Sequence, residues 1–251
     1  MAGRETADIV FCIDASGSMT RAIDGVKKNI KKLVDSLEST PNTTWDVRFD
    51  FLAYSNIDVR NNYRLESVKT SGKDLLNEVY AGDQQSGSKL FTSDVNEFKE
   101  ALNNIKVDGD ETTIPALDIA ADFPFRDAST CHRAIVLLTD ETIDTGCFKT
   151  ESKEKLMDLA QKLQSKKIAL YMVTPNCDEF DTLSQVDHCE WNICTDDGME
   201  DIDFSKLMQR IGRSVSMSQT QGTSKRDDSP KPLFNESKWH SRGEKFVELD
   251  I

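Results

Sequence analysis

Two short runs of apolar residues, 9–13 and 134–139, constrain the fold of this 251-residue chain most strongly. Both runs are nearly continuous rather than alternating, which is typical of strands that are covered on both faces. A helical pattern follows the first run directly, with apolar residues spaced by three and four over residues 20–38. The sequence therefore predicts an α/β fold with a doubly wound, mainly parallel sheet, helices on both faces and one antiparallel edge strand.

Strand and helix patterns mostly alternate along the rest of the chain. The predicted strands are 8–13, 45–54, 63–68, 134–139, 168–173 and 190–194, and the predicted helices are 20–38, 94–105, 151–166 and 203–215, with a further helix starting near Pro115. Residues 70–93 predict a helix-containing connection. In the run 45–54, Val47, Phe49 and Phe51 alternate with polar side chains, which is typical of a strand.

The sequence predicts one domain over residues 1–216, followed by a linker and C-terminal tail over residues 217–251. The linker is rich in polar residues and ends near Pro230 and Pro232. Beyond it, a partly disordered tail is the default expectation, and the alternating residues of 247–251 give the alternative that the tail docks as an edge strand, on this domain or as a motif on a partner.

The charge balance limits the classes of partner. Lys and Arg number 31 against 44 Asp and Glu, a net charge of −13, which argues against nucleic acid and anionic membranes and favours cations or basic surfaces. We find no apolar run of bilayer length and no secretion signal in the first residues, so we expect a cytoplasmic protein that does not bind membranes.

An acidic residue follows each of the two apolar runs. Asp14 comes directly after the first run, and Asp140 comes directly after the second. Ligands of open α/β sheets bind beyond the carboxyl ends of the strands, so both carboxylates lie on one edge if the strands are neighbours. Neutral oxygens are supplied by Ser16, Ser18 and Thr112. An all-oxygen set suits a hard cation, with Mg²⁺ preferred and Mn²⁺ or Ca²⁺ as alternatives.

These residues resemble the metal-ion-dependent adhesion site of von Willebrand factor A domains. The resemblance rests on Asp14-x-Ser16-x-Ser18, on Thr112 before a Pro-Ala-Leu helix, and on residues 137–141, and it covers about residues 7–216. It implies the fold given above and assigns the five residues as metal ligands, with the aspartates acting directly or through water. The implied location is intracellular.

Two positions depart from the family pattern. Thr113 adjoins Thr112 in a loop without the usual glycine pair, so Thr113 is an alternative ligand. Glu141 stands where glycine is common, and its carboxylate would either crowd or supplement the site.

The resemblance implies a magnesium-dependent protein–protein interaction module, acting as an adaptor or scaffold. The implied partner is a protein that presents Asp or Glu to the metal, such as an AAA+ ATPase or a component of a stress or defence system. The alternative is a regulatory subunit or enzyme component that uses the metal to orient an acidic substrate. The sequence contains no nucleophile elbow and no phosphate loop, so we do not expect an enzyme.

Residues 176–203 contain ten acidic side chains and no Lys or Arg, which predicts a solvated acidic loop. The segment also contains Cys177, His188, Cys189 and Cys194. Zinc binding and disulfide formation are alternatives for these residues, and unmodified thiols are the default expectation.

Overall fold

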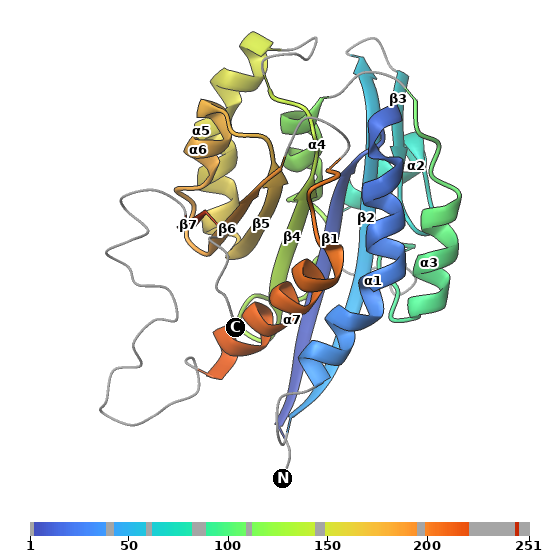
Figure 1. Ribbon diagram of the computed structural model, residues 1–251, viewed down its shortest axis with the longest axis vertical. Coiled ribbons are helices and arrows are strands. Elements are labelled where there is room, and N and C mark those ends of the chain that lie inside the picture. The colour runs from blue at the N-terminus through green and yellow to red at the C-terminus, as the bar shows by residue number, and fades with distance from the viewer. Residues whose placement is uncertain are drawn as a thin grey trace.

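The sheet of this protein, seen in a computed structural model, is mainly parallel and has the strand order β3-β2-β1-β4-β5-β6-β7 over the part of the chain that is described (Figure 1). The structure describes residues 3–38, 43–58, 62–81, 89–108, 112–143, 149–194, 199–220 and 244–245. The strands are β1 (Gly3–Asp14), β2 (Thr43–Asp58), β3 (Asn62–Glu66), β4 (His132–Leu138), β5 (Ile168–Thr174), β6 (Cys189–Ile193) and β7 (Glu244–Lys245).

Seven α-helices and one 3₁₀ turn accompany the sheet in the described ranges. They are η1 (Gly17–Met19), α1 (Thr20–Glu38), α2 (Gly72–Tyr80), α3 (Val95–Asn103), α4 (Thr113–Ala120), α5 (Lys149–Ser165), α6 (Asp178–Leu183) and α7 (Phe204–Thr220). Asp94 caps α3 as the sequence suggests, because its carboxylate accepts from the backbone N–H groups of Asn96 and Glu97.

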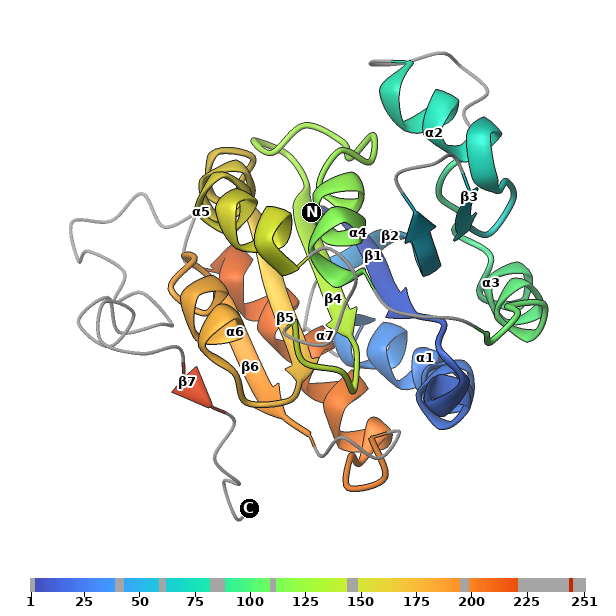
Figure 2. The same cartoon turned by 90° about the horizontal axis from the view of Figure 1, so that it is seen from above.

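Helices cover both faces of the sheet (Figure 2). In β1, the alternate residues Ile9, Phe11 and Ile13 pack with α1, α3 and α7, whereas Val10 and Cys12 pack with α2, α4, α5 and α6. All five of these side chains are fully buried. This double burial explains why the apolar run is continuous, and it confirms the predicted doubly wound architecture.

The centre of the sheet determines where the site lies. β1 pairs in parallel with both β2 and β4, and β3 is an antiparallel edge strand on β2. The register aligns Ile13 with Leu138, so β1 and β4 finish side by side at the same edge. Because the chain leaves β1 toward β2 through α1 and returns to β4 on the other side of β1, this edge is the point where the winding direction reverses.

Three features differ from the sequence predictions. The segment 176–203 is not simply a solvated loop, because it contains α6 and buries Glu179, in addition to β6, which confirms the strand predicted at 190–194. Asp50, on the polar side of the alternation in β2, is fully buried, because the segment around Phe91 covers that side of the strand. Helix α7 continues to Thr220, past the predicted helix end at residue 215.

The edge strand predicted for residues 247–251 lies outside the described residues. A shorter strand, β7, pairs in parallel with β6 just before it. Within the described ranges, none of the helices combines the length and the apolar character that a bilayer crossing requires.

Candidate metal-binding site

The rim formed by the ends of β1 and β4 contains the predicted carboxylates. Asp14 is the last residue of β1, and Asp140 follows shortly after the end of β4. Their side chains are buried, with exposed fractions of 0% and 1%. Ser16 and Ser18 lie in the turn from β1 into α1, where Ser16 is buried and Ser18 is exposed.

Hydrogen bonds join four of the five predicted ligands. The backbone N–H of Ser16 donates to Asp14 Oδ1 over 2.8 Å, which folds the turn back over its own strand. The hydroxyl oxygens of Ser16 and Ser18 are 3.1 Å apart. Ser18 Oγ donates to Asp140 Oδ1 over 3.0 Å, a contact that spans 122 positions of sequence. The fold therefore brings two carboxylates and two hydroxyls from separate loops to one place.

Thr112 and Thr113 have different surroundings. Thr113 Oγ1 is 3.0 Å from the hydroxyl oxygen of Tyr54, and both side chains are buried. Thr112 precedes α4, and its side chain does not cap that helix. The Thr113 hydroxyl thus has a hydrogen-bond partner in the core, Tyr54, which argues against Thr113 as a metal ligand. The residues before Thr112, 109–111, lie outside the described ranges.

A second group of polar side chains, which the sequence reasoning missed, lies beneath the rim. Thr139 Oγ1 donates to Asp14 Oδ2 over 2.8 Å. The Glu141 backbone N–H donates to the same Thr139 oxygen over 3.2 Å, and Tyr54 is also hydrogen-bonded to Thr139. Thr139 links the aspartates of β1 and β4, because it contacts one and precedes the other. In the sequence, the only indication of this role is that Thr139 directly precedes Asp140.

Asp14 influences the titration of its neighbours. Burial, reinforced by the negative charge of Asp14, raises the pKa of the Cys12 thiol well above its usual value. The same two causes, in the same order, raise the pKa of the Tyr54 hydroxyl. Both groups are therefore neutral at physiological pH, and Tyr54 remains a hydroxyl donor beneath the rim.

The donor set fits a hard divalent cation. Carboxylate and hydroxyl oxygens are the ligands that Mg²⁺ and Ca²⁺ prefer, and the set contains no sulfur or imidazole. No three His, Cys, Asp or Glu side chains of the described residues form a metal-binding cluster, the rim included, because the rim combines two carboxylates with hydroxyl oxygens. The cysteines at positions 177, 189 and 194 form no disulfide with another described cysteine. The structure thus gives no support to the zinc and disulfide alternatives.

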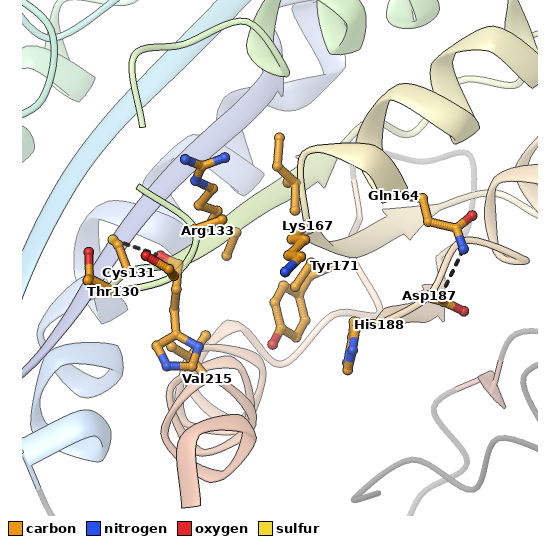
Figure 3. Close-up of a pocket in the computed structure, with 15 residues that line it drawn as sticks. Thr130, Cys131, Arg133, Gln164, Lys167, Tyr171, Asp187, His188 and Val215 are labelled. Atoms are coloured by element: carbon orange, nitrogen blue, oxygen red, sulfur yellow. Dashed lines mark hydrogen bonds between the residues drawn. The ribbon is translucent and has the colours of Figure 1, made fainter. Parts of the chain in front are cut away.

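Two hollows lie at opposite ends of the sheet. One, with a volume of about 580 Å³, includes Ser18 and is bordered by α1 and the start of α7. The other, of about 530 Å³, is at the amino ends of β4 and β5, where Figure 3 shows Lys167, Tyr171 and His188 around it. On its wall, the Gln164 amide donates to Asp187 over 2.9 Å. Only the first hollow adjoins the candidate site.

Comparisons with known proteins place the fold. Residues 8–95 match the family model of the von Willebrand factor type A domain. The chain is similar to a solved structure described as von Willebrand factor type A from Catenulispora acidiphila, with 17% identity, a TM-score of 0.53, and coverage of 84% of this chain and 43% of that one. It is also similar to proximal thread matrix protein 1 from the mussel byssus, with 12% identity, a TM-score of 0.53, and coverage of 85% and 48%. A comparison with curated proteins gives no match.

The family model of the von Willebrand factor type A domain thus matches about a third of the chain, and the two solved structures, at 17% and 12% identity, show that the fold is shared. Domains of this family are generally protein-interaction modules. The chain spans less than half the length of either solved structure. The matched segment includes Asp14, Ser16 and Ser18 but ends before Thr112 and Asp140, so the positions of the last two come from the structure.

Proposed function

We propose that this chain is a magnesium-dependent protein-interaction module that binds a carboxylate of a partner protein at the rim of β1 and β4. The metal ligands in this proposal are Asp14, Ser16, Ser18, Thr112 and Asp140. The role is one of binding and not of catalysis.

The observation that carries the proposal is the contact between Ser18 and Asp140. The 3.0 Å hydrogen bond joins a turn that follows β1 to a loop that follows β4, although 122 positions separate them. Ser16, which lies 3.1 Å from Ser18 through its hydroxyl, extends the group. Two carboxylates balance the formal charge of a divalent cation, but octahedral Mg²⁺ takes six ligands and the set offers five, so one coordination position remains for an acidic side chain of a partner.

The protein residues have separate roles in this proposal. Asp14 and Asp140 supply the charge that holds the cation, and the serines supply neutral oxygens. Thr139 and the Ser16 backbone fix the two carboxylate oxygens of Asp14 in place. Ser18 is exposed, so it lies where an incoming side chain arrives.

The wider setting is proposed from the family resemblance alone. We propose an adaptor or scaffold role in the cytoplasm, beside an AAA+ ATPase or within a stress or defence system. Glu141, which adjoins Asp140, remains a candidate for supplementing the metal charge.

Titration calorimetry with MgCl₂ tests the metal claim. We expect one binding event on the wild type and affinity weaker by on the order of tenfold for Ser18→Ala, which removes a ligand from an exposed position. Ser71→Ala, an exposed serine whose side chain does not cap α2, is the matched control and should bind as the wild type does. Absence of heat with the wild type, or equal affinity for Ser18→Ala, would refute the assignment.

A pull-down from native extract tests the interaction. Immobilised wild-type protein should retain a partner in Mg²⁺ and release it when a chelator is added, and an Asp140→Asn column should retain none. Equal retention in chelator would show that the cation does not bridge the two proteins.

A further inference from the structure

Positive charge in this acidic chain is concentrated on two helices. Together, α1 and α7 contain eight Lys and Arg against three Asp and Glu. The rest of the chain contains 23 basic and 41 acidic residues, by difference from the totals of 31 and 44. The two helices are therefore a basic surface on a protein that is otherwise strongly acidic.

The two helices lie side by side on one face of the sheet (Figures 1 and 2). A Cβ atom on Gly212 of α7 would lie 2.6 Å from the carbonyl oxygen of Leu33, and one on Gly25 of α1 would lie 2.4 Å from the Phe204 ring. Glycine at these positions permits the close approach. Lys32 of α1 also donates to Ser205 Oγ over 2.6 Å. The charges of both helices thus belong to one rigid surface.

Hollows follow the seam between α1 and α7, starting at the candidate metal site. The hollow of about 580 Å³ begins at Ser18 and includes Arg21 and Lys28. A second, of about 240 Å³, lies farther along the same seam and includes Lys32 and Arg213. We call this strip, from Ser18 to Arg213 between α1 and α7, the basic groove.

The acidic residues of the groove do not cancel its charge, because its lining contains three acidic residues, Asp24, Asp35 and Asp203, against four basic ones, Arg21, Lys28, Lys32 and Arg213. Asp24 pairs with Lys28 over 3.5 Å, but both side chains are at least half exposed, so the pair is weak. Asp203 accepts from the backbone N–H groups of Ser205 and Lys206 and so caps α7. Arg21, Lys28 and Arg213, which line the groove, are all exposed.

We propose that the basic groove binds an acidic segment of the partner protein, with one carboxylate of that segment at the metal rim. This inference rests on the proposed function, because the rim end of the groove is the candidate metal site. Helix α1 contains 19 residues and is about 28 Å long, which an extended peptide of about eight residues spans.

Charge complementarity favours a peptide over other anions. A short acidic peptide fits within the basic groove, whereas a nucleic acid or a membrane would extend over the surrounding acidic surface and be repelled. The partner segment is thus expected to be short and rich in Asp and Glu.

The test uses fluorescein-labelled octaglutamate, followed by fluorescence anisotropy at low ionic strength in Mg²⁺ and in EDTA. The triple variant Arg21→Glu/Lys28→Glu/Arg213→Glu should weaken binding about tenfold or more in both conditions, because the charges of three exposed residues that line the groove are reversed. The control is Lys73→Glu/Lys89→Glu/Lys155→Glu, which makes the same charge change at exposed lysines outside the groove. It should weaken binding less than about threefold.

Equal weakening by the two triple variants would overturn the proposal that the groove binds the peptide, because only the overall charge of the protein would then matter. Tighter binding of single-stranded DNA of equal charge, or of phosphatidylserine vesicles, would also overturn it. The variant Asp140→Asn tests the metal claim separately from the groove, because its peptide binding should no longer differ between Mg²⁺ and EDTA. If the groove variant loses binding but the wild type binds equally in Mg²⁺ and EDTA, the groove stands and the metal bridge fails. If the wild type binds more tightly in Mg²⁺ than in EDTA and the groove variant binds as the wild type does, the metal bridge stands and the groove fails.

Discussion

Strand β1 carries two fully buried aspartates whose surroundings differ. Asp8 accepts charged hydrogen bonds from Arg48 and Arg126, at 2.6 to 2.9 Å. Asp14 accepts from the Ser16 backbone and the Thr139 hydroxyl, both of which are neutral. The hydrogen bonds from Arg48 and Arg126 bring positive charge to Asp8, whereas the two from Ser16 and Thr139 bring none to Asp14. One buried carboxylate therefore stabilises the fold, and the other, on the function proposed above, serves a cation.

The largest expected effect is the loss of the Asp8 charge. Asp8→Asn should cost about 3 to 5 kcal/mol in the free energy of unfolding, because two arginines would keep their charge beside a neutral group. Asp46→Asn is the control, since Asp46 pairs with the same Arg126 but is 33% exposed and should cost less than about 1 kcal/mol. Urea unfolding measures both variants.

The comparison between the two aspartates can also be tested at Asp14, the last residue of β1. Asp14→Asn should cost less than half as much as Asp8→Asn, because the donors from Ser16 and Thr139 that would then face a neutral side chain are themselves neutral. Equal costs for Asp8→Asn and Asp14→Asn would show that the two sites do not differ as described.

The pH dependence of stability sharpens the role of Asp8. Burial opposes its charge, but the hydrogen bonds and charges of Arg48 and Arg126 outweigh burial and lower its pKa. The carboxylate is thus more acidic in the folded state than in the unfolded state. Its contribution is present above the unfolded pKa and is lost as the pH falls through the folded value.

Asp50 of β2 shows what neutral donors do to a buried carboxylate in this fold. It accepts from the backbone N–H groups of Phe51, Val68 and Phe91, but burial outweighs these bonds and raises its pKa to about 6. The folded state then holds the proton more tightly than the unfolded state, so stability falls as the pH rises from about 4 to about 6.

A further prediction uses the opposite pH dependence of stability that Asp50 causes. Between pH 4.5 and 7, the wild type should lose about 2 kcal/mol of stability relative to Asp50→Asn, which has no carboxyl to titrate. Urea midpoints of both proteins at the two pH values give the difference and remove the contribution of other carboxylates. A constant difference would contradict the raised pKa.

The sequence predicted the sheet and most of the rim because these depend on local patterns. Continuous apolar runs identified β1 and β4, and the residues that follow them, Asp14 and Asp140, lie at adjacent strand ends as expected. The contacts of Asp8 could not be predicted, because Arg126 lies 118 positions away and is brought in by the loop before β4. Burial of Asp50 was missed because alternation does not reveal what covers the polar side of a strand.

Two smaller features also escaped the sequence. Helix α6 contains six residues, too few to show a helical period among acidic side chains. The choice between Thr112 and Thr113 depends on Tyr54, whose position opposite Asp14 is set by the register of β1 and β2.

The smallest effect on stability is expected at Thr139. Thr139→Val removes the hydroxyl that donates to Asp14, at a cost of about 1 kcal/mol. Because this contact orients a proposed metal ligand, Mg²⁺ affinity should fall about 10-fold or more in calorimetry. Thr130→Val, at an exposed position at the other end of the sheet, should leave Mg²⁺ affinity unchanged. Unchanged affinity for Thr139→Val would exclude a positioning role.

The most direct test of the central claim is the effect of Mg²⁺ on the midpoint of thermal unfolding, Tm, compared with EDTA. A ligand that binds only the folded state stabilises it, by about 2.7 kcal/mol at a concentration 100 times Kd. We predict that MgCl₂ raises the Tm of the wild type and of Asp46→Asn but not that of Asp140→Asn. An equal rise in Asp140→Asn, or no rise in the wild type, would contradict the account of the rim as a cation site.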